Sequence, residues 1–166
     1  MKVREEKLFE TLKKFQKELP HFPDGRIDYS HSNVSPVLTV FISVGEEILL
    51  LKRSDKVGTY KGKWNTVAGY LDEVRPLQEK ISEELHEELS LPPELILKIS
   101  LGKPYKYLDI AISKTWLIHP VFVTLKAKPK IKIDWEHTEY AWIKPSELKK
   151  YDVVPGLEKS YKYARM

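Results

Sequence analysis

Apolar residues recur at helical spacing near the start of the chain. They are Leu8, Leu12, Phe15 and Leu19, at intervals of four, three and four residues. This spacing predicts one apolar stripe on an amphipathic helix over residues 3–19, which Pro20 ends. Because such a stripe needs a partner, we expect the helix to cover an apolar surface. Residues 21–35 are polar, with a proline and a glycine, and are predicted to be a connector.

The middle of the chain has the composition of β-strands. Apolar and β-branched residues fill 36–44 and 48–51, and Gly45-Glu46-Glu47 between them predicts a hairpin turn. Helical spacing returns at 77–89. Further strands are expected at 65–71, 96–101, 106–112, 115–125 and 140–143, and short helices are expected to begin at Pro145 and Pro155.

This order of elements predicts the fold class. Strands dominate the middle, and helices lie at both ends and once inside, so we expect an α+β fold in which helices cover a mixed β-sheet. A length of 166 residues suits one domain. Residues 1–33 would form an N-terminal helical extension and connector, and residues 34–166 the core.

Composition narrows the function classes. The chain has no cysteine, which excludes disulfide frameworks, thiolate metal sites and cysteine nucleophiles. Its 28 basic and 24 acidic residues give a net charge of +4. That charge favours an anionic ligand and leaves a nucleic-acid partner open but unsupported. No long apolar run predicts a membrane span, and acidic residues interrupt the N-terminus, so we expect a cytoplasmic protein.

Carboxylates on the predicted helix 77–89 lie close to its apolar stripe. The stripe is Leu77, Ile81, Leu85 and Leu89. On a helical wheel with Leu77 at zero, Glu88 falls at about 20°, Glu84 at about −20° and Glu87 at about −80°. Glu84 and Glu88 are therefore placed inside or beside the buried face, where like charges repel one another.

Two interpretations of these carboxylates remain open from spacing alone. A hard divalent cation such as Mg²⁺ would compensate their charge, because it takes oxygen ligands and bridges carboxylates to substrate phosphates. A solvated charged helix in a protein rich in Lys and Glu explains the same residues without a ligand.

The segment AGYLDEVRPLQEKISEELHEELSL, residues 68–91, resembles the Nudix box of the Nudix hydrolases. Set on Gly69, the pattern matches Glu84, Leu85, Glu87, Glu88 and Leu91. The resemblance extends outward through LLLKRS, GKWNTVAGY and WEHTEYAWIKPSEL, and covers roughly residues 36–157.

Three positions depart from the box. Arg75 stands where the box has Glu, Glu83 where it has Arg, and Ser90 where it has Gly. The first two changes leave the summed charge as in the family, which suggests a swapped ion pair. Eight residues of straight helix span about 12 Å, so Arg75 would have to fold back from the loop before Pro76. Ser90 is expected to weaken the left-handed cap of the helix.

The resemblance implies a Nudix-type αβα sandwich with an extra N-terminal helix. It implies hydrolysis of a nucleoside diphosphate linked to another group, with Mg²⁺ or Mn²⁺ as cofactor. The metal ligands would be the Gly69 carbonyl, Glu84, Glu87 and Glu88, and Glu84 and Glu87 would also take part in catalysis.

The remaining candidates lie outside the box. A general base varies in position in this family, and Glu136 and Glu139 are both candidates. Arg53 and Lys63 are candidates for binding phosphate. Gly69 is also a candidate for binding substrate, because a residue without a side chain permits a close approach. Tyr105, Tyr107 and Trp135 are candidates for stacking on a nucleobase.

Two hypotheses of different kinds follow. The first is a metal-dependent Nudix pyrophosphohydrolase acting on a small nucleotide or nucleoside diphosphate derivative. The second is a catalytically impaired Nudix-fold module that binds nucleotide or RNA, motivated by Arg75 and Glu83. A homodimer is left open, and no membrane partner is expected.

Overall fold

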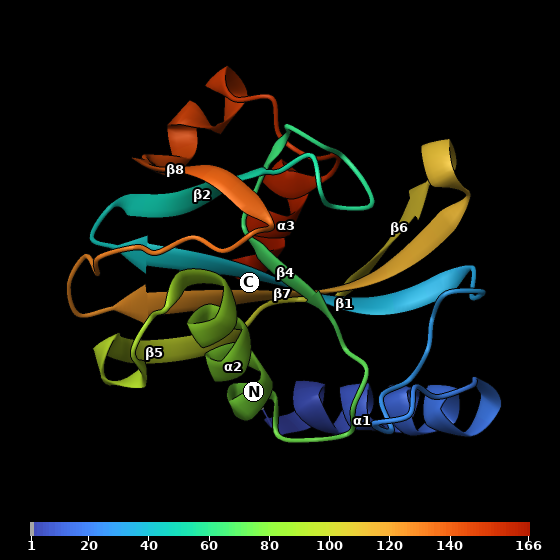
Figure 1. The fold of residues 1–166 in the computed structure, drawn as a ribbon. Helices are drawn as coiled ribbons and strands as arrows, with labels where there is room; N and C mark the ends of the chain where they lie inside the picture. Colours follow the sequence, from blue (N-terminus) through green and yellow to red (C-terminus); the bar gives the residue numbers. More distant parts are fainter. Residues whose placement is uncertain (1) are drawn as a thin grey trace.

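A computed structural model describes residues 2–166 (Figure 1). The helices are α1 (Lys2–Glu18), α2 (Leu77–Leu89) and α3 (Leu157–Ala164), with short 3-10 helices η1 (Pro93–Leu95), η2 (Ile110–Ile112) and η3 (Pro145–Lys150). The strands are β1 (Val34–Val44), β2 (Glu47–Arg53), β3 (Trp64–Asn65), β4 (Val67–Tyr70), β5 (Ile96–Leu101), β6 (Tyr105–Asp109), β7 (Lys114–Leu125) and β8 (His137–Ile143).

Strand β1 is the centre of an eight-stranded sheet. The main path runs β3-β2-β1-β7-β5, and β4 pairs with β1, β6 with β7 and β8 with β2. β1 and β7 run parallel, from Val34 opposite Thr115 to Ser43 opposite Thr124, while the other pairings are antiparallel. The predicted α+β fold with a mixed sheet between helices is confirmed.

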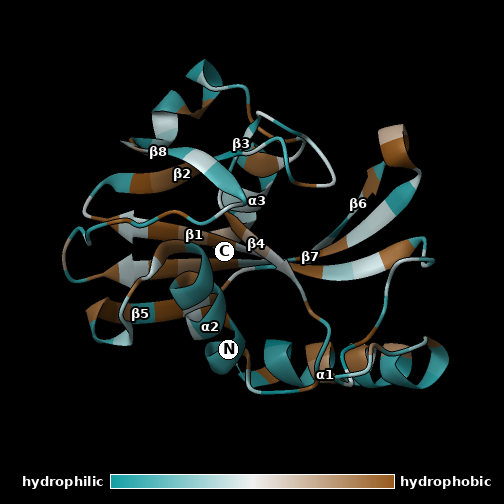
Figure 2. Ribbon diagram, viewed as in Figure 1, coloured by the Kyte–Doolittle hydropathy of each residue, from teal (hydrophilic) through white to brown (hydrophobic). Residues whose placement is uncertain are grey.

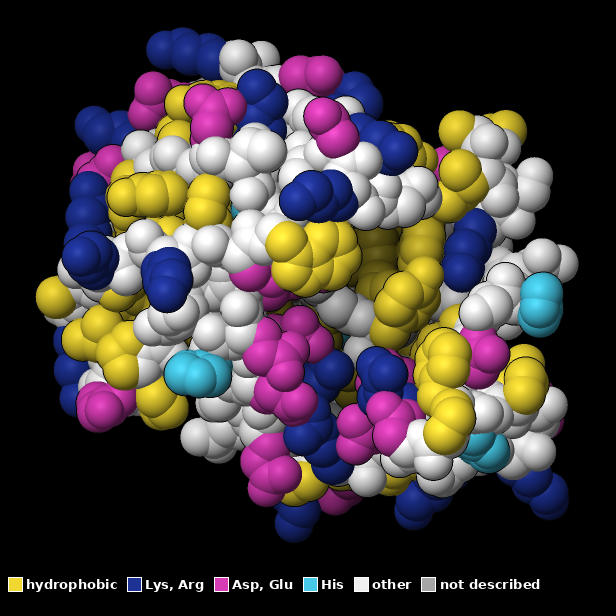
Figure 3. Space-filling view, in the orientation of Figure 1, with side chains coloured by type: hydrophobic (Ala, Val, Ile, Leu, Met, Phe, Trp, Pro, Cys, Tyr) yellow, Lys and Arg dark blue, Asp and Glu magenta, His cyan; other side chains and the backbone are white. Residues whose placement is uncertain are grey.

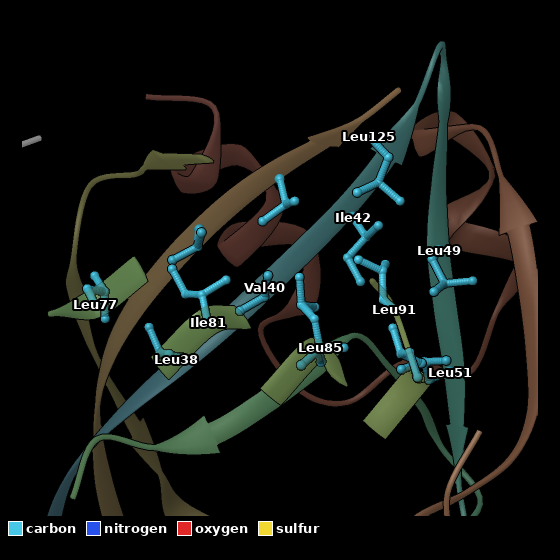
Figure 4. Close-up of a cluster of buried hydrophobic side chains, with 14 of the residues drawn as sticks. Leu38, Val40, Ile42, Leu49, Leu51, Leu77, Ile81, Leu85, Leu91 and Leu125 are labelled. Carbon is cyan, nitrogen blue, oxygen red and sulfur yellow. The ribbon is translucent and has the colours of Figure 1, made fainter. Parts of the chain in front are cut away.

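The two faces of the sheet carry separate apolar clusters. Side chains alternate along a strand, so Leu49 and Leu51 of β2 face one cluster while Ile48 and Leu50 face the other. The first cluster receives α2 through Leu77, Ile81, Leu85 and Leu89 (Figure 4). The second receives Leu157 and Ala164 of α3. Hydrophobic residues accordingly concentrate along the strands, and the helices carry mixed bands (Figure 2).

Helix α1 covers part of the same face as α2. Leu8 and Leu12, 2% and 1% exposed, join the first cluster together with the α2 stripe. This confirms the expectation that the N-terminal stripe covers an apolar surface. Within residues 2–166 no helix has the length and apolar character needed to cross a membrane.

Several predicted elements differ in their bounds: the strand expected over 65–71 is divided into β3 and β4, and the strand expected over 140–143 begins at His137. The strand expected over 106–112 ends at Asp109, because the chain reverses there to pair Asp109 of β6 with Lys114 of β7. Residues 110–113 form that turn, with Ser113 at φ 51°. The last helix begins at Leu157 rather than at Pro155, since Gly156 precedes it with φ 82° in the left-handed region.

The C-terminal end of α2 has a left-handed cap at Ser90. Ser90 adopts the left-handed conformation, φ 54° and ψ 34°, that the family's glycine would favour, and its amide donates to the carbonyl of His86. Serine in this region carries some backbone strain. The cap is therefore formed despite the substitution, and α2 ends at Leu89.

Candidate active site

A cleft of about 850 Å³ opens beside α2. The α2 side of the cleft, its acidic end, carries four glutamates, while the aromatic side chains come from other elements; Figure 3 shows acidic and hydrophobic side chains bordering the hollow. The acidic lining includes Glu83, Glu84, Glu87 and Glu88 of α2, together with Glu136. The aromatic lining is Tyr60, Tyr70, Tyr107, Trp116 and Trp135.

The α2 glutamates differ in burial as the helical wheel predicts. Glu88 is only 4% exposed and lies among the apolar residues of the helix, while Glu87 is exposed at the cleft edge. The Glu84 side chain is 12% exposed. Burying carboxylates is costly unless a cation or hydrogen bonds compensate, so a purely solubilising role does not explain these two positions.

Glu88 lies close to Glu136, in the turn before β8, and to His137, the first residue of β8. Ligand atoms of Glu88, Glu136 and His137 all lie within 4.8 Å of one another. Burial, followed by the interaction with Glu136, raises the pKa of Glu88 well above its ordinary range. The Oε2 atom of Glu88 is buried and makes no hydrogen bond within residues 2–166. A bound cation would satisfy that oxygen and favour the ionised carboxylates.

The environment of His137 favours an uncharged imidazole in this group. Burial lowers its pKa, although the nearby Asp134 and Glu136 oppose that shift. Its Nδ1 lies 3.2 Å from Oδ1 of Asp134, which orients the ring. A neutral, oriented imidazole can act as a ligand or a hydrogen-bond partner. Sequence reasoning did not select His137, because its spacing to the α2 glutamates is visible only in the fold.

Gly69 makes room for the Glu84 carboxylate. It lies on β4 opposite Leu38 of β1, so the strand is held against the sheet centre. A Cβ placed at residue 69 would stand 2.8 Å from Oε1 and 2.9 Å from Cδ of Glu84. Only glycine allows this approach without a shift, so Gly69 and Glu84 form one unit of the site.

Lys80 neutralises Glu84 from the preceding turn of α2. Its Nζ lies 2.8 Å from Oε1 of Glu84 and 3.6 Å from Oδ1 of Asp72, which is also buried. Burial raises the pKa of Glu84, and the Lys80 ammonium lowers it in part. Sequence reasoning missed Lys80 and Asp72. The i,i+4 spacing of Lys80 and Glu84 was an available signal.

Arg75 and Glu83 form the predicted ion pair. A guanidinium nitrogen of Arg75 contacts Oε2 of Glu83, and Nε of Arg75 lies 4.0 Å from Oε2 of Glu73. The side chains are 25% and 40% exposed. The two residues that depart from the box therefore compensate each other's charge. Arg75 contacts Glu83 from the loop before Pro76 and so connects that loop to α2.

We expect this pair to couple in a double-mutant cycle. Arg75→Glu would place a third carboxylate beside Glu73 and Glu83, and Glu83→Arg would place a second guanidinium beside Arg75, so each single change should lower metal-dependent activity about tenfold. The double change restores opposite charges and should recover most of it. The stability coupling should stay under about 1 kcal/mol, because the pair is partly exposed. Additive losses of activity in the double variant would show that the positions do not communicate.

Arg53 extends from the end of β2 into the cleft lining. Its Nε donates to the carbonyl of Thr59 at 2.9 Å, which ties the loop after β2 to the strand. Burial lowers its pKa, while Glu136 and Glu88 raise it. The guanidinium is therefore fixed between the loop and the acidic end of the cleft.

Two of the charged sequence candidates do not line the cleft. Lys63 lies outside the lining, and its Nζ pairs with Oδ1 of Asp152 at 2.8 Å. Glu139 is exposed on β8, and its Oε2 lies 3.0 Å from Nζ of Lys52. Glu136 lies in the turn before β8 and lines the cleft, so the two base candidates, Glu136 and Glu139, do not share one environment. Glu136 is the one that the fold brings to Glu88.

The aromatic part of the cleft lining also contains a buried carboxylate. Asp109, at the end of β6, is 4% exposed and accepts a hydrogen bond from the Tyr60 hydroxyl. Tyr107 and Trp135 line the cleft, as the stacking hypothesis requires. Tyr105 does not line the cleft, and its hydroxyl forms a hydrogen bond with the hydroxyl of Ser160 on α3.

Comparison with known proteins identifies the class of this fold and site. The family model for the NUDIX domain matches residues 33–164. The chain belongs to the Nudix family, which confirms the resemblance read from residues 68–91 and the expectation of a Nudix-type hydrolase. The N-terminal helix α1 lies outside the matched region.

Individual relatives agree with this assignment. A protein named nucleoside triphosphatase NudI from Escherichia coli is 28% identical over 121 residues, covering 68% of this chain and 83% of the relative. A Shigella flexneri protein of that name matches equally.

Solved structures share the fold. A NUDIX hydrolase from Nitrosomonas europaea superposes with a TM-score of 0.63 at 19% identity, covering 79% of this chain and 88% of that one. An Ap4A hydrolase from C. elegans gives 0.61 at 14% identity, covering 78% and 93%.

Proposed function

We propose that this protein is a metal-dependent pyrophosphohydrolase acting on a nucleoside diphosphate linked to another group, which includes a nucleoside triphosphate. The observation that carries the proposal is one cleft lined by both buried carboxylates and several aromatic rings. The acidic end suits a diphosphate held through a cation, and the rings suit a nucleobase.

The residues present fit a divalent cation. Glu84 and Glu88 are proposed as ligands, with Glu87 at the cleft edge and the Gly69 carbonyl beside them. The buried Oε2 of Glu88 without a hydrogen bond supports this assignment, as does the close packing of Glu84 on Gly69. Mg²⁺ or Mn²⁺, when bound there, supplies charge neutralisation for the phosphate oxygens and lowers the pKa of the attacking water.

The chain's own residues would then direct the reaction. Glu136 is proposed as the general base: its carboxylate takes a proton from a water whose oxygen forms the new bond to phosphorus. The bridging P–O bond breaks, and its electron pair leaves with the departing phosphate. Arg53 is proposed to hold phosphate oxygens, since its guanidinium is fixed at the acidic end.

The substrate class follows from the lining of the cleft and from the relatives. Tyr107 and Trp135 provide rings in the same cleft as the carboxylates, and curated relatives are named nucleoside triphosphatases. A nucleoside triphosphate is therefore the first substrate class to test. Lys63 and Glu139, which lie outside the cleft, have no part in this proposal.

A panel of nucleotides tests the proposal. The purified protein is incubated with Mg²⁺ and ribo- and deoxyribonucleoside triphosphates, nucleoside diphosphate sugars and dinucleoside polyphosphates, and products are separated by chromatography. We expect at least one compound to yield a nucleoside monophosphate and the complementary phosphate product. The Glu84→Gln variant, run in parallel, controls for contaminating phosphatases. Nucleotides that bind but are recovered intact would contradict the proposal and support the binding module.

A further inference from the structure

The amino end of α2 has no cap of its own. Pro76 occupies the N-cap position, and no side chain of the local sequence bonds the first-turn amides. The first amides of a helix lack intrahelical partners and need an acceptor. Here the amide of Leu77 donates to Oε1 of Glu5, at 2.9 Å. Glu5 is more than seventy residues away along the chain.

Contacts of the neighbouring residues of α1 fix the position of Glu5. Its neighbour Arg4 donates to the carbonyl of Leu101 at the end of β5, at 2.6 Å, and to the carbonyl of Met166. One turn later Leu8 is buried in the cluster that also holds Leu77. The Glu5 carboxylate is therefore placed at the end of α2 by the docking of α1, and its negative charge also favours the positive end of the helix dipole.

The capped helix carries the proposed ligands. Lys80 comes three residues after Leu77 and pairs with Glu84, and Glu88 follows one turn further on. The Arg75–Glu83 contact spans the same end of the helix. A loosened first turn of α2 would disturb these contacts first, because local opening begins at helix ends.

We infer that Glu5 is a positioning residue for the site: the N-terminal extension, which lies outside the family domain at residues 33–164, caps α2 and thereby sets the geometry of Glu84 and Glu88. The inference rests on the proposed function in one respect, the assignment of those glutamates as metal ligands. Glu5 does not line the active-site cleft. It lines a separate cavity of about 140 Å³ where α1 meets α2 and β5, so contact with substrate is not its role.

Three variants of the full chain test this role. Glu5→Ala removes the acceptor, and Glu5→Gln keeps an oxygen that can accept the Leu77 amide. Glu6→Ala is the matched control, since Glu6 is the exposed neighbour on the same helix. Hydrogen exchange at the Leu77 amide reports the cap, and titration with Mn²⁺ alone, followed by EPR, reports the ligands. Both are measured well below the unfolding temperature of every variant.

Glu5→Ala should speed exchange at Leu77 by about tenfold, the size expected for a lost helix cap, and should weaken Mn²⁺ binding by several-fold. In catalysis the loss should fall on kcat rather than KM, because the substrate contacts remain. Glu5→Gln should restore most of both properties, and Glu6→Ala should match the wild type.

The outcomes separate the two proposals. Wild-type protein that binds no Mn²⁺ would overturn the ligand assignment and this inference together. Wild-type protein that binds Mn²⁺ and hydrolyses nucleotide, with Glu5→Ala indistinguishable from Glu6→Ala, would overturn the inference alone. Faster exchange at Leu77 with unchanged Mn²⁺ affinity would show a cap that does not position the site, and would overturn it as well.

Discussion

Replacing Glu84 or Glu88 with glutamine should lower turnover on the order of a thousandfold or more and leave the fold intact. Glutamine keeps the shape of each side chain but removes the negative charge that a cation needs. The measurement is kcat and kcat/KM with saturating Mg²⁺ for each variant. Glu79→Gln is the matched control, because it makes the same exchange at an exposed position of α2 outside the cleft. Full activity in Glu84→Gln or Glu88→Gln would contradict the metal assignment.

The same Glu88→Gln variant should also change how stability depends on pH. The raised pKa of Glu88 means that the folded state binds its proton more tightly than the unfolded chain does. This tighter proton binding stabilises the folded state. The stabilisation is fully present at a pH below the ordinary carboxyl pKa, and it is lost as the pH rises from there toward the raised pKa of Glu88. Without metal, Glu88→Gln should therefore gain in unfolding temperature relative to wild type between pH 5 and pH 8. The same difference in unfolding temperature between Glu88→Gln and wild type at pH 5 and at pH 8 would contradict this prediction.

Gly69→Ala should reduce activity by about ten- to a hundredfold with little change in unfolding temperature. The added methyl group would stand 2.8 Å from Oε1 and 3.1 Å from Oε2 of Glu84. The strand backbone tolerates alanine, so the carboxylate at the end of a flexible side chain has to move instead. That movement separates Glu84 from Lys80 and from the other ligands.

Gly58→Ala is the control for this substitution. Residue 58 lines the same cleft as residue 69, but it has no atom within 4 Å of a new Cβ and is not in the left-handed region, so the activity of Gly58→Ala should stay near the wild-type level. Activity and thermal unfolding are measured for both variants. Wild-type activity in Gly69→Ala would show that the position of the Glu84 carboxylate is not critical.

Much of the fold follows from local patterns in the sequence. The stripe of α2 predicts both the burial of Ile81 and Leu85 and the placement of Glu88 beside them, because a helix has a fixed period. The strands follow from their β-branched residues. The turn at Ile110 and Ile112 was missed, because apolar residues that remain exposed in a hairpin look like a continuing strand.

The site was less accessible from sequence, since its parts meet across the fold. Spacing within α2 places Glu84 and Glu88, but only tertiary packing shows that Glu136, rather than Glu139, faces them. In the sequence, Lys63 and Arg53 are equivalent as cations near the Nudix box. In the fold, Lys63 forms an ion pair with Asp152. Long-range partners of this kind have no signature in sequence spacing.

The most direct test of the central claim is the dependence of hydrolysis on divalent cation. The wild-type protein is stripped with a chelator, dialysed, and assayed on the best substrate of the panel as Mg²⁺ is added stepwise. The account predicts no turnover without cation, saturable activation by Mg²⁺, and no comparable activation of Glu88→Gln. Turnover that survives complete chelation, or full activation of Glu88→Gln, would contradict it.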